Sequence, residues 1–409
     1  MDQDKENSSI SSSNKGNYTA EDLVHLTDRE HVRKRPGMYF GGTAERGVHQ
    51  TVEEVLELMI ECFKEGLTSS ISVVIHSDDT ITLCDDNTSC KLETLPESDG
   101  QNVETTNLEQ EFCQLRRVRR TSYFGLDPES SYYSRGLFGG PFTVAVNFVS
   151  LHMSVQSCSK TQVFRQSYCQ GEPEGPVETS TRSEESGTRI TFSLDPEIFE
   201  DDNRRFDFNC LRDRLEIHSY LNPGLAVRLR DERTGGEACF KNPNGVSDFL
   251  NRTSPFPSRP GIKSPIPILL HANDVGVDLE VALQPANRIT SFVNEFESVD
   301  GGTHHSSFFR VFADVLNEIG QREAYIDKQF SLPNSVDYEC QLQGMIAIRM
   351  DEPLWRGGTR DRLGSKLDAF ADQQIKPQLK QFFESQPDLA RSLIQRAASS
   401  VSDRESVCD

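Results

Sequence analysis

The sequence has no long apolar run and has fewer basic residues than acidic ones. Its 409 residues contain 43 Lys and Arg against 64 Asp and Glu, which gives a formal net charge of −21 at pH 7. This charge argues against broad electrostatic wrapping of nucleic acid or of an anionic membrane. The longest apolar runs are far shorter than the roughly 18 residues that cross a bilayer, so no membrane partner is expected.

A secretory leader and a paired-cysteine motif are also missing. Residues 1–17 are rich in Ser, Asn and charged side chains and have no apolar core, so they predict a disordered tail and not a signal peptide. The ten cysteines include no C-x-x-C pair, which argues against a zinc ribbon or a disulfide framework. Reduced thiols and a cytoplasmic protein are therefore expected.

The chain does contain clear helix-type and strand-type periodicity. From Val52 to Phe63 apolar side chains recur at i, i+3, i+4, i+7, i+8 and i+11, which predicts an amphipathic helix. A Pro- and Ser-rich stretch at 252–267 indicates a domain boundary. Alternating apolar residues predict strands at 70–77, 80–86, 151–157, 161–168, 188–194, 225–231, 277–284, 288–296 and 343–351. Further helices are predicted at 206–222, 245–251, 306–320 and 366–384.

Several motifs resemble, in their order, the family of DNA gyrase B and its topoisomerase IV counterpart. They are VRKRPGMYFGG at 32–42, the helix with Glu54, the strand ending in Asp85 and Asp86, RGLFGG at 135–140 and VDGGTHHSSF at 299–308. The resemblance implies an α/β fold: a GHKL-type ATPase sandwich at 18–253, then a ribosomal-S5-domain-2-like α/β transducer domain at 254–395. Residues 396–409 are expected to be a C-terminal tail, and the family's metal-binding TOPRIM domain is expected to be absent.

The resemblance assigns a catalytic pair whose members lie far apart in the sequence. Glu54 corresponds to the family's general base, a carboxylate that polarises a water molecule in line with the γ-phosphate. Arg360 stands in place of the transducer lysine that contacts the γ-phosphate, and it keeps the positive charge in a different shape. The residues alone leave an alternative open, in which Glu54 is a solvated surface acid like its helix neighbours Glu53, Glu57 and Glu61.

Further residues correspond to the family's nucleotide-binding positions. Asp85 matches the aspartate that accepts a hydrogen bond from the adenine amino group, and Thr188 matches a threonine beside it. Gly136, Gly139 and Gly140 match the lid glycines, whose backbone N–H groups cradle phosphates. From the residues alone, Asp85 is equally an acid that closes a strand, and Thr188 is equally an ordinary strand threonine.

The chain departs from the family at the metal position and in the loop after Asp85. Leu58 stands where the family has an asparagine that holds Mg²⁺, and leucine offers no oxygen to an ion that requires oxygen ligands. The family's glycine-rich turn is replaced by NTSCK at 87–91, whose side chains obstruct close approach to the base. Phosphoryl transfer depends on positioning and on charge neutralisation by Mg²⁺. The sequence therefore predicts weak ATP binding, no metal site and a pseudo-ATPase.

Three functions follow as alternatives. The first is a gyrase-B-like ATPase and transducer module with a decayed site that acts as a dimerising regulatory protein. The second is a working ATP-dependent DNA topoisomerase component that partners a separate cleavage subunit, and the third is a decoy that binds an authentic gyrase B. The expected partner is a second copy of the chain or a gyrase-B-type protein. The arginine-rich run at 116–120 could contact DNA phosphates weakly, but a charge run of this kind is more often a solvated face.

Overall fold

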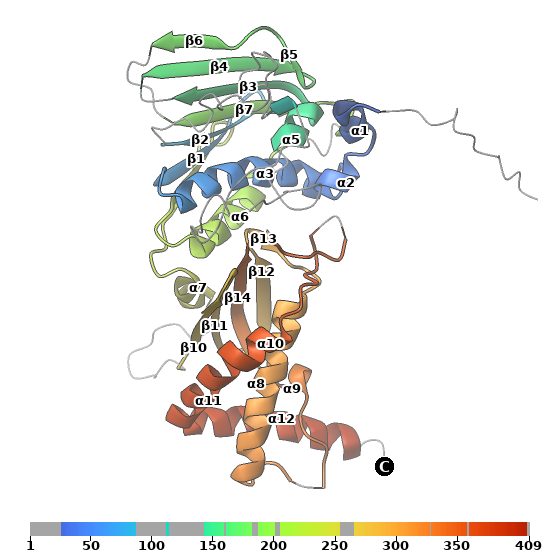
Figure 1. The fold of residues 1–409 in the computed structure, drawn as a ribbon, viewed down its shortest axis with the longest axis vertical. Helices are drawn as coiled ribbons and strands as arrows, with labels where there is room; N and C mark the ends of the chain where they lie inside the picture. Colours follow the sequence, from blue (N-terminus) through green and yellow to red (C-terminus); the bar gives the residue numbers. More distant parts are fainter. Residues whose placement is uncertain are drawn as a thin grey trace, which may run out of the picture.

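The computed structural model of the chain contains two α/β units, one above the other in Figure 1. The residues that it describes are 26–86, 112–113, 143–158, 161–181, 187–200, 205–253, 266–327, 329–357 and 360–406. Gly136, Gly139, Gly140 and the run at 116–120 lie outside the described residues. Within the described part, no helix has the length and apolar character needed to span a membrane.

The first unit is a mixed sheet with helices on one face. Its strands lie in the order β5-β4-β3-β7-β2-β1-β8-β9, with β6 paired to β4. They are β1 (Ser70–Ile75), β2 (Ile81–Asp85), β3 (Ser150–Cys158), β4 (Gln162–Cys169), β5 (Glu172–Pro173), β6 (Glu178–Thr181), β7 (Thr188–Leu194), β8 (Ala226–Asp231) and β9 (Gly236–Phe240). The helices are α1 (Asp28–Lys34), α2 (Gly37–Phe40), α3 (Glu45–Lys64), α5 (Thr143–Val149), α6 (Phe208–Leu221) and α7 (Val246–Thr253). The strands predicted at 70–77 and 80–86 are confirmed: β1 and β2 pair antiparallel as a hairpin, and Asp79 in their turn adopts a left-handed φ of 61°.

Helix α3 is buried on its acidic side as well as on its apolar stripe. The apolar stripe packs into the first core as the periodicity predicts. The acids are also less than one-tenth exposed: Glu53, Glu54, Glu57 and Glu61. The interpretation of these acids as solvated surface residues is therefore wrong, because α3 and α6 lie between the first sheet and the second unit (Figure 1). A buried carboxylate must be paired or hydrogen-bonded, so each acid needs a partner.

The second unit is a smaller sheet covered by long helices. Its strand order is β10-β11-β14-β12-β13, in which β12 and β14 run parallel. The strands are β10 (Ile268–Asp274), β11 (Val277–Pro285), β12 (Arg288–Val293), β13 (Phe296–Glu297) and β14 (Leu342–Met350). The helices are α8 (Thr303–Arg322), α9 (Ser335–Glu339), α10 (Asp368–Phe370), α11 (Lys376–Ser385) and α12 (Pro387–Ser406), and a π-helical turn at Ala371–Ile375 joins α10 to α11.

The C-terminal end differs from the expected tail at 396–409. Helix α12 continues to Ser406, and Ala397 and Val401 on it are buried. The polar composition of this segment suggested a tail, but a short apolar stripe is enough to pack a helix when a neighbouring surface is available. The expected boundary between the domains at 253/254 stays a prediction, since residues 254–265 lie outside the described part.

A small apolar cluster joins the two units. Helices α6 and α7 of the first unit pack against the face of the second sheet that lies opposite α8 (Figure 1). The cluster is formed by Tyr220, Leu221, Val246, Leu250, Ala282, Phe292, Met345 and Ala347. Burial of these side chains favours docking of the units by the hydrophobic effect, while the orientation of docking is left to more directional contacts.

Candidate nucleotide site and the interface beneath it

Glu54 and Arg360 come together, although more than 300 residues separate them in the chain. The Arg360 Nη1 atom lies 3.9 Å from Glu54 Oε1 and 3.7 Å from Glu57 Oε2, and these three side chains are almost fully buried. Gln50 also donates a hydrogen bond of 3.1 Å to Glu54 Oε1. The Arg360 guanidinium lies 4.2 Å above the centre of the Phe296 ring, which adds a cation–π contact.

The loop that carries Arg360 is held against the glycine motif of the second unit. Arg360 adopts a left-handed φ of 59°, which a non-glycine residue keeps only when its surroundings enforce it. The backbone N–H of Asp300 donates to Asp361 O at 3.0 Å. A Cβ atom at Gly302 would lie 2.7 Å from Leu363 N, so a side chain has no room there. The VDGGTH segment is therefore a platform for the Arg360 loop, a role that sequence reasoning did not identify.

Leu58 offers nothing to a metal ion. It lies one turn after Glu54, is half-buried, and packs against the first core. Mg²⁺ requires several oxygen ligands in near-octahedral geometry. On this side of α3 the oxygens of Glu54 and Glu57 already face the guanidinium of Arg360, and Leu58 adds only methyl groups. The residues present therefore do not fit a Mg²⁺ ion of the kind that the resemblance implies.

Asp85 and Thr188 are neighbours at the end of two paired strands. Asp85 is buried, and its Oδ1 atom accepts a hydrogen bond of 2.8 Å from the backbone N–H of Thr188. The Thr188 hydroxyl lies 3.1 Å from the Ser157 hydroxyl, so it is oriented by the adjacent strand β3. Gly187 adopts a φ of 88°, and a Cβ atom there would meet Asp85 O at 1.9 Å. A glycine is required at position 187 because the two backbones approach closely. In the sequence, the glycine directly before Thr188 is the signal that indicates this close approach.

Asp86, the second acid of this strand end, has a structural role. Its carboxylate accepts hydrogen bonds from the Thr68 hydroxyl, from the backbone N–H groups of Ser69 and Ser70, and from both of their hydroxyls. Burial raises the pKa of Asp86, but the hydrogen bonds from Ser69 and Thr68 outweigh burial and hold its pKa well below the usual range. Asp86 therefore joins the start of β1 to the end of β2 through hydrogen bonds. Of the two acids, Asp85 is the one that belongs to the candidate site.

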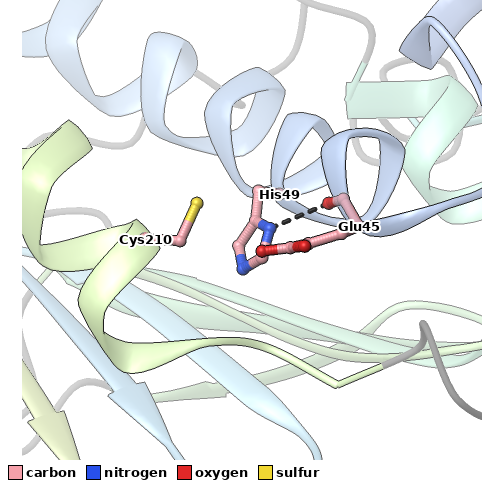
Figure 2. A group of neighbouring side chains, drawn as sticks. All are labelled: Glu45, His49 and Cys210. Atoms are coloured by element: carbon pink, nitrogen blue, oxygen red, sulfur yellow. Dashed lines mark hydrogen bonds between the residues drawn. The ribbon is translucent and has the colours of Figure 1, made fainter.

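The described part of the chain contains groups of histidine, cysteine and acidic side chains that could hold a metal ion. In each group the ligand atoms lie within 4.8 Å of one another, and Figure 2 shows one such group. In this group His49 points between Glu45 and Cys210 (Figure 2). Its Nδ1 donates to Glu45 O at 2.8 Å, and its Nε2 accepts from the Asp207 N–H at 3.0 Å. Burial lowers the pKa of His49, which agrees with a neutral ring that uses both nitrogens within the protein. His49 is thus a core residue that joins α3 to the start of α6, and it offers no nitrogen lone pair to a metal.

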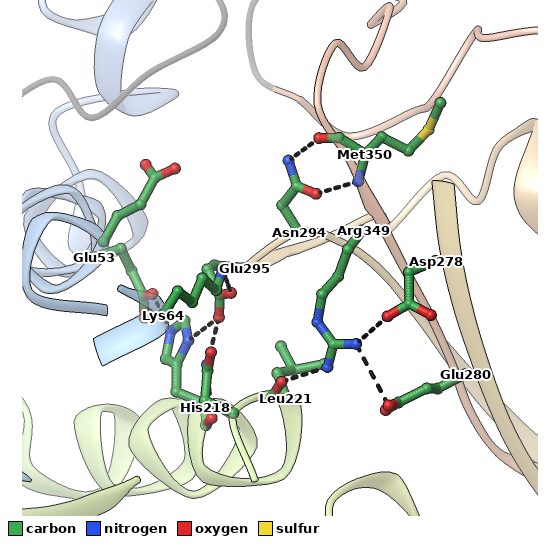
Figure 3. A network of polar contacts seen from close by, with 12 residues as sticks. Glu53, Lys64, His218, Leu221, Asp278, Glu280, Asn294, Glu295, Arg349 and Met350 are labelled. Atoms are coloured by element: carbon green, nitrogen blue, oxygen red, sulfur yellow. Dashed lines mark hydrogen bonds and ion pairs between the residues drawn. The ribbon is translucent and has the colours of Figure 1, made fainter. Parts of the chain in front are cut away.

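A second ionic network lies where α3 and α6 of the first unit meet Glu295 of the second (Figure 3). His218 on α6 lies 2.5 Å from Glu53 through Nε2 and 3.3 Å from Glu295 through Nδ1. Burial opposes a charge on the imidazole, yet the Glu53 carboxylate and the hydrogen bonds to Glu295 and Glu53 raise the pKa of His218 to about 10. For Glu53, burial is outweighed by His218 and Arg214, which lower its pKa to about 2. His218 is therefore a buried imidazolium between two carboxylates.

Several comparisons place this architecture among known proteins. Residues 245–407 match the sequence profile of the family described as DNA gyrase B. The gyrase B protein of Myxococcus xanthus is 29% identical over 92% of this chain and 45% of its own length. That of Thermotoga maritima is 28% identical over 95% of this chain and 60% of its own length. The chain therefore spans about half the length of the curated relatives it matches.

Solved structures agree on the fold. The 43K ATPase domain of Thermus thermophilus gyrase B, crystallised with an aminocoumarin, has a TM-score of 0.69 at 24% identity and covers 93% of this chain and 96% of that one. The crystal structure of the B-subunit of DNA gyrase from Myxococcus xanthus gives a TM-score of 0.70 at 21% identity, over 90% of this chain and 99% of that one. The expected GHKL-type sandwich followed by a transducer domain is thus confirmed as a fold. The chain is therefore similar to DNA gyrase B: its residues 245–407 match the profile of that family, and its similarity to gyrase B proteins extends over more than nine-tenths of its length.

Proposed function

We propose that the chain is a gyrase-B-like ATPase and transducer module that binds nucleotide weakly and does not hydrolyse it. It would then act as a dimerising regulatory protein, paired with a second copy or with a gyrase-B-type protein. The observation that supports this proposal is the Arg360 guanidinium facing Glu54 and Glu57, together with Leu58, one turn after Glu54, which has no oxygen to offer a metal ion.

The position of Arg360 argues against hydrolysis in two ways. A general base must lie within hydrogen-bond reach of the attacking water. The Oε1 atom of Glu54 already accepts from Gln50 and faces Arg360, so a water at that oxygen would compete with both partners. A transducer cation also has to reach a phosphate. Here the charge of Arg360 is compensated by Glu54 and Glu57, so binding to a phosphate would leave two buried carboxylates without their counter-charge.

The adenine side supports residual binding. Asp85 is buried and oriented by Thr188, a geometry that suits recognition of an adenine amino group. Adenine contacts without a metal contribute affinity but no neutralisation of the triphosphate charge. Weak, metal-independent nucleotide binding is therefore the expected behaviour.

Calorimetric titration of a non-hydrolysable ATP analogue, with and without Mg²⁺, tests this function. We expect the natural chain to bind weakly and equally well in both conditions. Leu58→Asn supplies an amide oxygen at the metal position, so we expect it to gain Mg²⁺-dependent affinity. The matched control is Leu58→Ala, which removes the same packing but provides no oxygen and should not respond to Mg²⁺.

The opposite outcome would favour the second function, a working ATP-dependent topoisomerase component. If the natural chain bound the analogue tightly and only with Mg²⁺, and also released phosphate from ATP, the pseudo-ATPase proposal would be wrong. Mixing the chain with an authentic gyrase B protein and measuring heterodimers by native mass spectrometry tests the decoy function in the same samples.

A further inference from the structure

We propose that Glu295 locks the two units in a single orientation without any nucleotide. We call the contact of Glu295 with Lys64, His218 and Asn222 the Glu295 lock, and Figure 3 shows Glu295 with Lys64 and His218. This inference concerns how the units are held together, and it goes beyond the proposed function because it does not depend on whether nucleotide binds.

The turn that carries Glu295 is rigid within the second unit. It links β12 to β13, and Asn294 at its start adopts a left-handed φ of 55°. The Asn294 side chain accepts from Met350 N at 2.8 Å and donates to Met350 O at 3.1 Å, so it is fastened to β14 by both ends of its amide (Figure 3). Asparagine tolerates this conformation better than most residues. The turn therefore presents Glu295 toward the first unit in one direction.

Both carboxylate oxygens of Glu295 are used by the first unit. Oε1 accepts from Lys64 Nζ at the end of α3. Oε2 accepts from Asn222 Nδ2 at 2.8 Å and from His218 Nδ1 at 3.3 Å, both at the end of α6. The Glu295 side chain is only 2% exposed. A carboxylate so deeply buried is tolerated because donors surround it, and these donors belong to the opposite unit.

The charges around the lock alternate in sign, and among these side chains Glu295 comes from the second unit while the others come from α3 and α6 of the first. Arg214 and His218 flank Glu53, and His218 and Lys64 flank Glu295. A buried ionic network of this kind adds little to affinity, because desolvation offsets the attraction, but loss of one partner is costly. A different orientation of the units would separate Glu295 from its three donors and leave His218 with Glu53 alone. The network therefore selects the orientation, while the apolar cluster of α6 and α7 supplies the attraction.

Other contacts between the two units hold the same orientation. Arg360 reaches Glu54 and Glu57, and Arg46 at the start of α3 lies 2.5 Å from Asp361. Arg349 also donates to Leu221 O at 2.7 Å (Figure 3). The cation that should respond to a phosphate is thus already engaged in the docked state. Because Glu54 and Glu57 already compensate the charge of Arg360, docking of the two units does not require a nucleotide phosphate.

Small-angle X-ray scattering of the full chain tests the lock with Glu295→Gln, which keeps the size of the side chain and removes its charge. We expect Glu295→Gln to show a larger radius of gyration than the natural chain and faster hydrogen exchange in residues 217–222. The matched control is Glu297→Gln, the same change at an exposed acid two residues away. Circular dichroism of each variant confirms that both units remain folded. The natural chain is also measured with and without Mg²⁺ and a non-hydrolysable ATP analogue.

The outcomes separate this inference from the proposed function. A natural chain whose scattering is unchanged by the analogue, together with an expanded Glu295→Gln and an unchanged Glu297→Gln, supports the lock. If the analogue bound tightly without changing the scattering, the proposed function would fail and the lock would stand. A natural chain that changes its radius of gyration on binding the analogue, or a Glu295→Gln chain that matches Glu297→Gln in scattering and exchange, overturns the lock.

Discussion

Asp85 and Glu54 are both buried carboxylates of the first unit, but they are satisfied in different ways. Asp85 accepts from the Thr188 N–H within its own sheet, so its surroundings form when that sheet forms. Glu54 faces Arg360 of the second unit, so its surroundings form only when the units dock. The adenine side of the candidate site is therefore a property of one unit, and the phosphate side is a property of the interface.

The largest effect is expected from a change in the interface network. His218→Gln removes the imidazolium between Glu53 and Glu295, and we expect a loss of about 3–5 kcal/mol in the free energy of unfolding at pH 7. Urea denaturation measures it. His152→Gln, at an exposed position on β3, is the matched control and should change little.

The same variant predicts a pH dependence with a definite sign. The pKa of His218 is raised to about 10 in the folded protein, from an ordinary value of 6.5, because Glu53 and Glu295 outweigh its burial. Its contribution is thus complete below pH 6.5 and is lost as the pH rises through 10. The difference between the natural chain and His218→Gln should shrink from pH 7 to pH 10. A difference that grew over this range would show that His218 is not charged when folded.

A smaller effect is expected at the phosphate side. Arg360→Ala leaves Glu54 and Glu57 without the positive charge that faces them. We expect the free energy of unfolding, measured by urea denaturation, to fall by about 3 kcal/mol. Water that enters the opened interface hydrates the two carboxylates, and this keeps the loss smaller than that of His218→Gln. The matched control is Arg356→Ala, an exposed arginine of the same loop. Equal stability of the two variants would mean that Arg360 does not compensate these acids.

The smallest effect is expected on the adenine side. Gly187→Ala places a methyl group against Asp85 O in a left-handed conformation, and we expect a loss of about 2 kcal/mol. Gly235→Ala has a similar φ of 75° but open space around the new methyl group, so it separates the clash from backbone strain. Small-angle scattering should be unchanged for Gly187→Ala, since the site of the clash lies within one unit. A larger radius of gyration for Gly187→Ala would show that the adenine side of the candidate site also depends on the interface between the units.

Most elements were predictable because their cause is local. The stripe of α3, the β1–β2 hairpin with its turn at Asp79 and the strands β3, β4 and β7 follow from periodicity and turn chemistry. The periodicity predicts that α8 starts at residue 306, yet the helix begins at Thr303. Gly301 and Gly302 indicate a turn by their residue type, but the pairing of this segment with the Arg360 loop starts the helix earlier.

The acids of α3 show where sequence reasoning failed. Glu53, Glu54 and Glu57 fall on the polar side of a helical wheel, and this pattern is typical of a solvated face. Their burial depends on α6 and on the second unit, which arrive from more than 150 residues further along the chain. Glu295 and His218 gave no signal for the same reason, since a single acid and a single histidine become a network only when the units dock.

The sequence by itself determined the two α/β units, the family resemblance, and the presence of a leucine where a metal ligand was expected, because these are properties of local pattern and residue type. Only the tertiary structure decided which charges meet. The energy of a buried charge depends on its nearest partners in a medium of low polarity, and those partners are set by how the units dock.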